Sequence, residues 1–129
     1  MMSKRVLIVE DDLLNRVLFC ALLEEKGFLV EPVSDERDAV ETAQRFDPHL
    51  IIMDIQLPHI SGLKLIESMK RNPGLAHVPV LAVTGYVGQG EERRVRRAGA
   101  SGYLPKPVSI QPFLAAVTRL MPAETADGA

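Results

Sequence analysis

The chain has 129 residues, a hydrophobic fraction of 47%, a charged fraction of 25% and a formal net charge of −2. This length suits one domain around one core, and the composition is ordinary for a soluble globular protein. We expect no DNA or membrane partner, because the charge is close to balanced and no apolar stretch approaches the roughly 20 residues of a membrane helix. Cys20 is the single cysteine, which excludes an internal disulfide and is typical of a cytoplasmic protein.

Strand-like and helix-like patterns alternate along the chain. In chain order they predict a strand over 4–9, a helix over 12–26, a strand over 28–33, a helix over 35–46, a strand over 49–54, a helix over 62–72, a strand over 78–83, a helix over 88–98, a strand over 102–104 and a helix over 109–121. Such alternation predicts the α/β class, with a doubly wound, five-stranded parallel sheet. We expect residues 1–122 to form one domain and residues 123–129 to be a disordered tail. We therefore expect no output domain within this stretch of 129 residues.

The first predicted helix carries two apolar stripes. The stripe expected to face the core has the spacing i, i+3, i+4, i+7 and i+8 and consists of Leu14, Val17, Leu18, Ala21 and Leu22. A second stripe is formed by Asn15, Phe19 and Leu23. Two interpretations of Phe19 and Leu23 stay open: an exposed apolar patch that docks a partner, or side chains buried under neighbouring elements.

Acidic side chains follow two of the predicted buried strands. Glu10, Asp11 and Asp12 end the first strand, and Asp54 ends the third. Because the carboxyl ends of parallel strands meet in one crevice, we expect these carboxylates to converge. Neighbouring carboxylates either raise a pKa or bind a cation, and hard oxygen ligands suit Mg²⁺. The alternative is that the trio only caps the following helix, which we expect to be the main role of Asp12.

Two further polar residues are predicted at the same edge. Thr84 ends the fourth strand, and Lys106 lies between Pro105 and Pro107, which stiffen the backbone and fix where its side chain points. Each has a plainer interpretation, as a strand-end threonine and an ordinary loop lysine. Taken together, the residues describe a nucleophilic Asp54 that becomes an aspartyl phosphate, with Lys106 and Thr84 holding the phosphoryl oxygens.

Five segments of the chain resemble the response-regulator receiver domain of two-component signalling. They are residues 6–12, 53–58, 61–63, 82–85 and 99–107. The resemblance covers residues 4–121, and among receiver domains the chain is most similar to the stand-alone, single-domain DivK type. It implies a CheY-like (flavodoxin-like) fold of five βα units. It also implies a phosphorelay regulator that is not an enzyme, although it assists its own phosphorylation and dephosphorylation.

The resemblance assigns roles to individual residues. It implies that Asp54 is the phosphoacceptor and that Lys106 and Thr84 assist it. The ligands of Mg²⁺ (or Mn²⁺) would be Glu10, Asp11, Asp54 and the backbone carbonyl of Gln56. Thr84 and Tyr103 would be the switch pair. Gly85 and Tyr86 depart from the commoner pattern. Tyr86 is expected to shade the site and alter the lifetime of the phosphoryl group, or to make Tyr103 less important.

The resemblance also implies partners. A histidine kinase or histidine phosphotransfer protein would dock at Asn15, Phe19, Leu23 and Pro107, and a downstream effector would bind the switched form. The protein would be a monomer or weak dimer. Two competing functions are a constitutive partner-binding pseudo-receiver and a haloacid-dehalogenase-like phosphohydrolase. Against the latter, Gln56 stands where those enzymes carry a second acid, and an amide is no general acid.

The segment 91–97 carries four arginines after two glutamates. Clustered arginines on one helix are one mark of nucleic-acid binding. The glutamates, however, lie at helical spacing from Arg94 and Arg96. We therefore expect a solvated, ion-paired helix face instead, which also borders the predicted switch region.

Overall fold

The computed structural model describes residues 3–86 and 88–123. The elements in chain order are β1 (Arg5–Val9), α1 (Leu13–Glu25), β2 (Leu29–Val33), η1 (Glu36–Asp38), α2 (Ala39–Phe46), β3 (Leu50–Asp54), α3 (Gly62–Arg71), β4 (Val80–Thr84), α4 (Glu91–Ala98), β5 (Gly102–Pro105) and α5 (Ile110–Leu120). The expected alternation is confirmed, except that the helix predicted over 35–46 begins as a separate 3₁₀ turn, η1. Residues 124–129, most of the expected tail, lie outside the described residues. None of the helices in the described ranges is long and apolar enough to cross a membrane.

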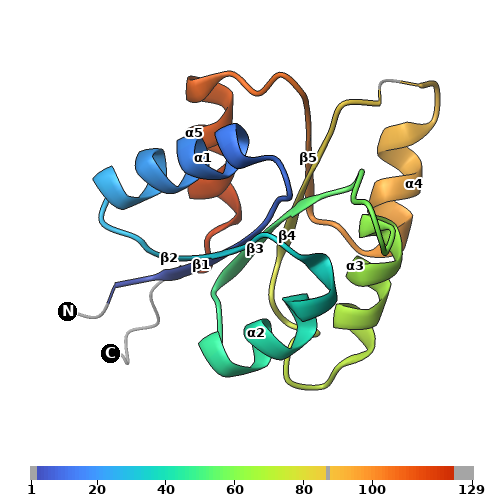
Figure 1. Cartoon of the computed structure of the whole chain (residues 1–129), viewed down its shortest axis with the longest axis horizontal. Coiled ribbons are helices and arrows are strands. Elements are labelled where there is room, and N and C mark those ends of the chain that lie inside the picture. Colours follow the sequence, from blue (N-terminus) through green and yellow to red (C-terminus); the bar gives the residue numbers. More distant parts are fainter. Residues whose placement is uncertain (1–2, 87, 124–129) are drawn as a thin grey trace.

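The five strands form one parallel sheet in the order β2-β1-β3-β4-β5. Helices α1 and α5 cover one face, and α2, α3 and α4 cover the other (Figure 1). This is the predicted doubly wound α/β fold. The chain passes from β1 to β2 on one side and then crosses to β3 on the other side of β1, so the switch point of the strand order lies between β1 and β3. In open sheets of this kind, the crevice beyond the carboxyl ends of the strands at that switch point is where ligands bind.

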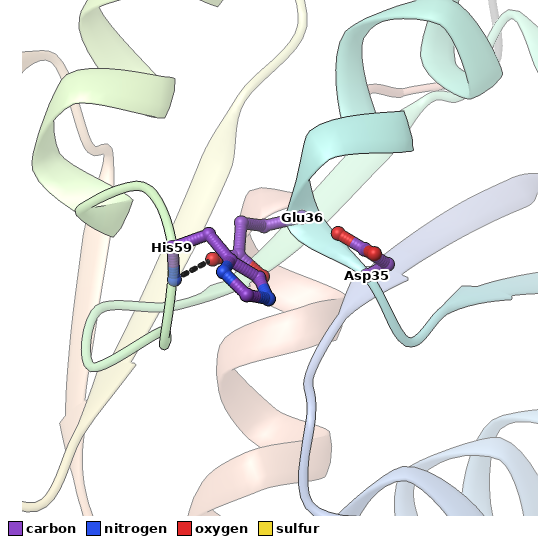
Figure 2. A group of neighbouring side chains, drawn as sticks. All are labelled: Asp35, Glu36 and His59. Atoms are coloured by element: carbon purple, nitrogen blue, oxygen red, sulfur yellow. Dashed lines mark hydrogen bonds between the residues drawn. The ribbon is translucent and has the colours of Figure 1, made fainter.

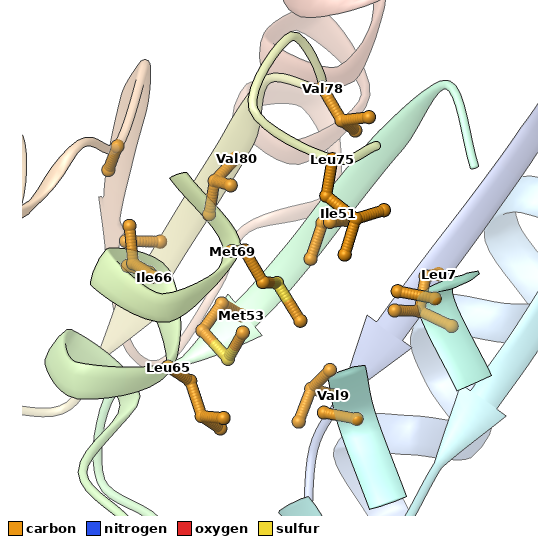
Figure 3. Close-up of a cluster of buried hydrophobic side chains, with 14 of the residues drawn as sticks. Leu7, Val9, Ile51, Met53, Leu65, Ile66, Met69, Leu75, Val78 and Val80 are labelled. Atoms are coloured by element: carbon orange, nitrogen blue, oxygen red, sulfur yellow. The ribbon is translucent and has the colours of Figure 1, made fainter. Parts of the chain in front are cut away.

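The core has two halves, one on each face of the sheet, because successive side chains of a strand point to opposite faces. Leu7 and Val9 of β1 pack under α2 and α3, whereas Val6 and Ile8 pack under α1 and α5. Figure 3 shows the first half, in which Met53 and Met69 lie between strand β3 and helix α3. All five residues of β3 and of β4 are buried. Burial on both faces explains why these strands are continuous apolar runs in the sequence.

The buried face of α1 differs from the one expected. Phe19 and Leu23 are 1% and 0% exposed, whereas Leu14 is 79% and Val17 58% exposed. The ring of Phe19 stacks on Phe113 of α5, with centroids 4.7 Å apart. The prediction that the stripe containing Leu14 and Val17 faces the core is therefore wrong. Of the two interpretations of Phe19 and Leu23, burial under neighbouring elements is confirmed, so the docking role assigned to their side chains is wrong. Both stripes have helical spacing, and the aromatic partner on α5 decides between them.

The arginine-rich helix α4 is ion-paired as expected. Arg94 Nη1 lies 3.2 Å from Glu91 Oε1, and Arg96 Nε lies 2.9 Å from Glu92 Oε2. Glu91 is buried, while Arg94 and Arg96 are largely exposed. Val95 is the core residue of this helix, so the arginines lie on its solvated side.

The packing of α1 predicts a contrast between two substitutions. Phe19→Ala should lower the free energy of unfolding by about 3–5 kcal/mol, because it leaves a cavity against Phe113. Leu14→Ala, on the exposed stripe, should change it by no more than about 0.5 kcal/mol. Urea denaturation followed by circular dichroism measures both. Equal losses for the two variants would contradict the observed orientation of α1.

Candidate functional site

Four strands bring their predicted site residues to one edge of the sheet. Glu10 follows β1, Asp54 ends β3, Thr84 ends β4 and Lys106 follows β5. Glu10, Asp54 and Thr84 are all buried, whereas Asp11 is exposed beside them. The convergence predicted from strand ends is therefore present in the structure.

One oxygen from each of Glu10, Asp11 and Asp54 lies within 4.8 Å of the others. Lys106 Nζ is 3.2 Å from Asp54 Oδ2 and 3.1 Å from Glu10 Oε1. Three carboxylates and one ammonium leave two negative charges without compensation in this group. Glu10 Oε1 is also buried, and its contact with Lys106 is an ion pair without the alignment of a hydrogen bond. This donor set fits a hard divalent cation, because Mg²⁺ binds through one or two carboxylates and retains water.

The electrostatics of the acids follow from this crowding. Burial raises the pKa of Asp54, and the adjacent Glu10 carboxylate raises it further, while Lys106 opposes both. Burial and the Asp54 carboxyl likewise raise the pKa of Asp11. Burial alone would lower the pKa of Lys106, but attraction to Asp54 and Glu10 outweighs it and raises that pKa. Lys106 therefore stays cationic, and the Asp54 and Asp11 carboxylates hold protons more tightly than free acids do.

The backbone after Asp54 is held closely against α3. The N–H of Gln56 donates to Asp54 Oδ1 at 3.0 Å, and the N–H of Gly62 donates to the carbonyl of Ile55 at 3.0 Å. A Cβ at position 62 would lie 2.4 Å from the backbone oxygen of Asp54 and 2.6 Å from Ile55 Cα. Only glycine allows this approach, so Gly62 helps to place the end of β3.

Two features of the site were not anticipated from the sequence. The side-chain Oε1 of Gln56 accepts the N–H of Gly85 at 3.0 Å, which joins the loops after β3 and β4. Arg16 Nη1 donates to the carbonyls of Glu10 at 2.9 Å and of Asp11 at 3.2 Å. The first pair has no local signal, since its members are 29 residues apart. The expected metal ligand of Gln56 is its carbonyl, and that role stays a prediction.

The remaining acid, Asp12, caps α1 as expected. Its Oδ2 accepts the N–H of Asn15 at 2.9 Å, while its own N–H donates to Glu10 Oε2 at 3.1 Å. Asn15 is half-buried at this helix start. The cap therefore also orients the Glu10 carboxylate.

The residues expected to switch lie around β4 and β5. Thr84 Oγ1 accepts the N–H of Tyr86 at 3.1 Å, and the carbonyl of Thr84 accepts the N–H of Lys106 at 2.7 Å. Tyr86 is 52% exposed. Tyr103 is partly buried at the edge of the core and lines a groove with α4. Pro107 is exposed and follows a cis peptide bond. The switching, shading and docking roles stay predictions.

Residues 6–118 match the family described as the response regulator receiver domain. The chain belongs to this family. It is thus a receiver domain of two-component signalling, as its motifs indicated.

Particular relatives refine this assignment. The chain is 41% identical over 113 residues to the polar-differentiation response regulator DivK of Brucella ovis. The aligned region covers 88% of this chain and 92% of that protein. Its structure resembles the chemotaxis response regulator CheY4 of Vibrio cholerae, with a TM-score of 0.86, 25% identity and coverage of 92% of this chain and 99% of that one. It also resembles the receiver domain of the sensor histidine kinase PA1611 of Pseudomonas aeruginosa, with a TM-score of 0.84, 28% identity and coverage of 93% and 98%. That domain was crystallised with a magnesium ion coordinated in its active-site cleft.

The raised pKa of Asp54 predicts that its charge opposes folding. An acid whose pKa is raised on folding destabilises the folded state once it is ionised. Asp54→Asn should therefore raise the free energy of unfolding at neutral pH by on the order of 1 kcal/mol when a chelator is present. Mg²⁺ should stabilise the wild type and so reduce the difference in the free energy of unfolding between the wild type and Asp54→Asn.

Urea denaturation with chelator and then with Mg²⁺ measures this effect. Asp47→Asn is a matched control, because Asp47 is exposed and its left-handed backbone tolerates asparagine. An Asp54→Asn protein that is less stable than the wild type in chelator would show that the Lys106 contact outweighs the repulsion.

Proposed function

We propose that this chain is a phosphorylation switch that accepts a phosphoryl group on Asp54 from a histidine kinase or a histidine phosphotransfer protein. The observation that carries the proposal is the buried Asp54 carboxylate, 3.2 Å from Lys106 Nζ and grouped with two further carboxylates. A structural aspartate needs one cation as its partner. This one faces a lysine and two like charges, which is an arrangement suited to a cation and a phosphate.

The transfer begins with attack of an Asp54 oxygen on phosphorus. The bond between phosphorus and the donor nitrogen breaks, and the donor imidazole leaves with the electron pair. Lys106 and Thr84 hold the phosphoryl oxygens, through the ammonium and the hydroxyl group respectively. A Mg²⁺ ion (or Mn²⁺) held by Glu10, Asp11, Asp54 and the carbonyl of Gln56 would supply charge neutralisation.

The position of Gln56 argues against a turnover hydrolase. A phosphohydrolase of the haloacid-dehalogenase type needs a general acid two residues after its nucleophile. The Gln56 side chain cannot release a proton as a carboxylic acid does, and its oxygen already accepts the N–H of Gly85. A stable aspartyl phosphate that changes partner binding fits this site better.

The partner surface that we propose for the phosphoryl donor is the exposed stripe of α1. Leu13, Leu14 and Val17 are each more than half exposed on the helix that follows Glu10 and Asp11, and Leu18 is partly exposed. This stripe takes the docking role first expected of Phe19 and Leu23, whereas Asn15 and Pro107 keep theirs as border positions. For the output, we propose that movement of Thr84 towards the phosphoryl group draws Tyr103 inward beside α4 and favours an effector there. Donor and effector would meet the chain in the cytoplasm, where it acts as a monomer or weak dimer.

The test is the intact-protein mass after incubation with Mg²⁺ and acetyl phosphate. The wild type and the control Asp47→Asn should each gain one phosphoryl group. Asp54→Asn should gain none, and chelator should abolish the adduct. Lys106→Ala should reduce the yield at least tenfold, since it removes the only cation 3.2 Å from the nucleophile in the described structure.

The absence of an adduct can have two causes, and a beryllofluoride titration distinguishes them. A folded wild type that binds beryllofluoride with Mg²⁺ but shows no phosphoryl mass hydrolyses its phosphate quickly, and the proposal stands. A folded wild type that shows no phosphoryl mass and also does not bind beryllofluoride is a constitutive partner-binding domain, and the proposal fails.

A further inference from the structure

A second group of metal-ligating side chains lies outside the Asp54 site. Asp35 and Glu36 stand at the start of η1, and His59 lies in the loop between β3 and α3. One potential ligand atom from each of the three lies within 4.8 Å of the others. In Figure 2 the imidazole of His59 extends towards η1 beside the Glu36 carboxylate, and the Asp35 carboxylate lies on the far side of Glu36.

Glu36 is the unusual member of this group, because it is only 1% exposed. Its Oε2 accepts the backbone N–H groups of His59 and, at 2.7 Å, of Ile60. Its Oε1 is buried and accepts no hydrogen bond within the described residues. Burial alone would raise the pKa of Glu36, but the backbone N–H groups outweigh it and lower that pKa. The side chain is therefore an ionised, buried carboxylate with one oxygen unpartnered, which calls for a cation or another donor.

The other two side chains offer complementary donors near the surface. Asp35 Oδ1 accepts both the backbone N–H and the Nε of Arg37 at 3.0 Å, and Oδ2 accepts Nη2 at 2.7 Å and Nε at 3.3 Å. This pairing holds the pKa of Asp35 well below its usual range, so Asp35 stays ionised, and a metal ion would share Oδ2 with Arg37. His59 is exposed, which leaves its imidazole free to turn towards Glu36. Carboxylate oxygens and an imidazole nitrogen are thus presented to one point.

We propose that Asp35, Glu36 and His59 form a second cation site, for a divalent transition metal such as Zn²⁺. The imidazole decides the class of metal, because imidazole suits Zn²⁺ and its neighbours, whereas Mg²⁺ prefers oxygen alone. In a tetrahedral zinc site, bonds of about 2.0–2.2 Å place the ligand atoms roughly 3.4 Å apart. Ligand atoms that lie within 4.8 Å of one another must therefore move closer by rotation of their side chains to bind the ion. Water completes the coordination.

Binding at this site would join η1 to the loop that follows Asp54. That loop is already fixed to Glu36 by two backbone hydrogen bonds. The ion would add the His59 side chain to this link. The inference does not depend on phosphorylation of Asp54.

The experiment is a Zn²⁺ titration of the full chain, followed by two-dimensional NMR of the imidazole nitrogens. Excess Mg²⁺ is present, to occupy the Glu10, Asp11 and Asp54 group. The first equivalent of Zn²⁺ should shift the ring signals of His59. His77, exposed before β4, and His49, whose Nδ1 accepts the N–H of Arg5 at 2.9 Å, should stay unchanged.

Variants then assign the ligands. His59→Ala and Glu36→Gln should each weaken Zn²⁺ binding at least tenfold by calorimetry, while His77→Ala and Asp54→Asn should bind as the wild type does. The amide introduced by Glu36→Gln retains an oxygen for the two backbone N–H groups, so the loop contact survives. If that buried substitution prevents folding, Asp35→Asn takes its place with the same expected loss.

Three results would overturn the proposal. The first is that Zn²⁺ shifts His59 and His77 at the same concentration, which is surface binding to histidines. The second is unchanged affinity in His59→Ala. The third is no shift of His59 at millimolar Zn²⁺.

Discussion

The functional site depends on the burial of negatively charged carboxylates next to one another. Glu10 and Asp54 are almost fully buried with Asp11 at their side, and in the described part of the chain Lys106 is the one cation that pairs with both carboxylates. Two carboxylates about 4 Å apart repel by roughly 4 kcal/mol at an effective dielectric of 20. The fold tolerates this because β1, β3 and β4 are apolar on both faces, and the large core offsets the local cost. A stability cost concentrated in one crevice is typical of a functional site.

The strands and the acids of the site were predictable because their signals are local. The run over 50–53 is buried on both faces, and polarity returns at Asp54 where the strand ends. Parallel strands then carry their polar ends to the same edge. The bounds of the elements differ from the predicted ones by no more than three residues, and the helix over 35–46 divided into η1 and α2.

Features that depend on distant residues were not predictable. The first helix has two apolar stripes, and only the stacking of Phe19 on Phe113, far along the chain, selects the buried one. The group formed by Glu36 and His59 joins segments that follow β2 and β3, which do not pair, because β1 lies between them. A single acid and a single histidine 23 residues apart carry no sequence signal. Such contacts follow from topology, which the sequence pattern specifies only in outline.

The loop over residues 55–61 is where these observations meet. Near its N-terminal end, Gln56 holds Asp54 through its backbone N–H and reaches Gly85 through its side chain. The far end of the loop is fixed to Glu36 by the N–H groups of His59 and Ile60. A phosphoryl group on Asp54 must find room between this loop and the loop after β4. The Gln56–Gly85 hydrogen bond therefore has two outcomes: it breaks, or the two loops move together. Because Glu36 holds the far end of the first loop, the second loop and Thr84 beside it are the parts with more freedom to respond. If Asp54 is phosphorylated as proposed, this asymmetry would place the response next to α4 and Tyr103, on the opposite side of the site from the proposed cation at Glu36.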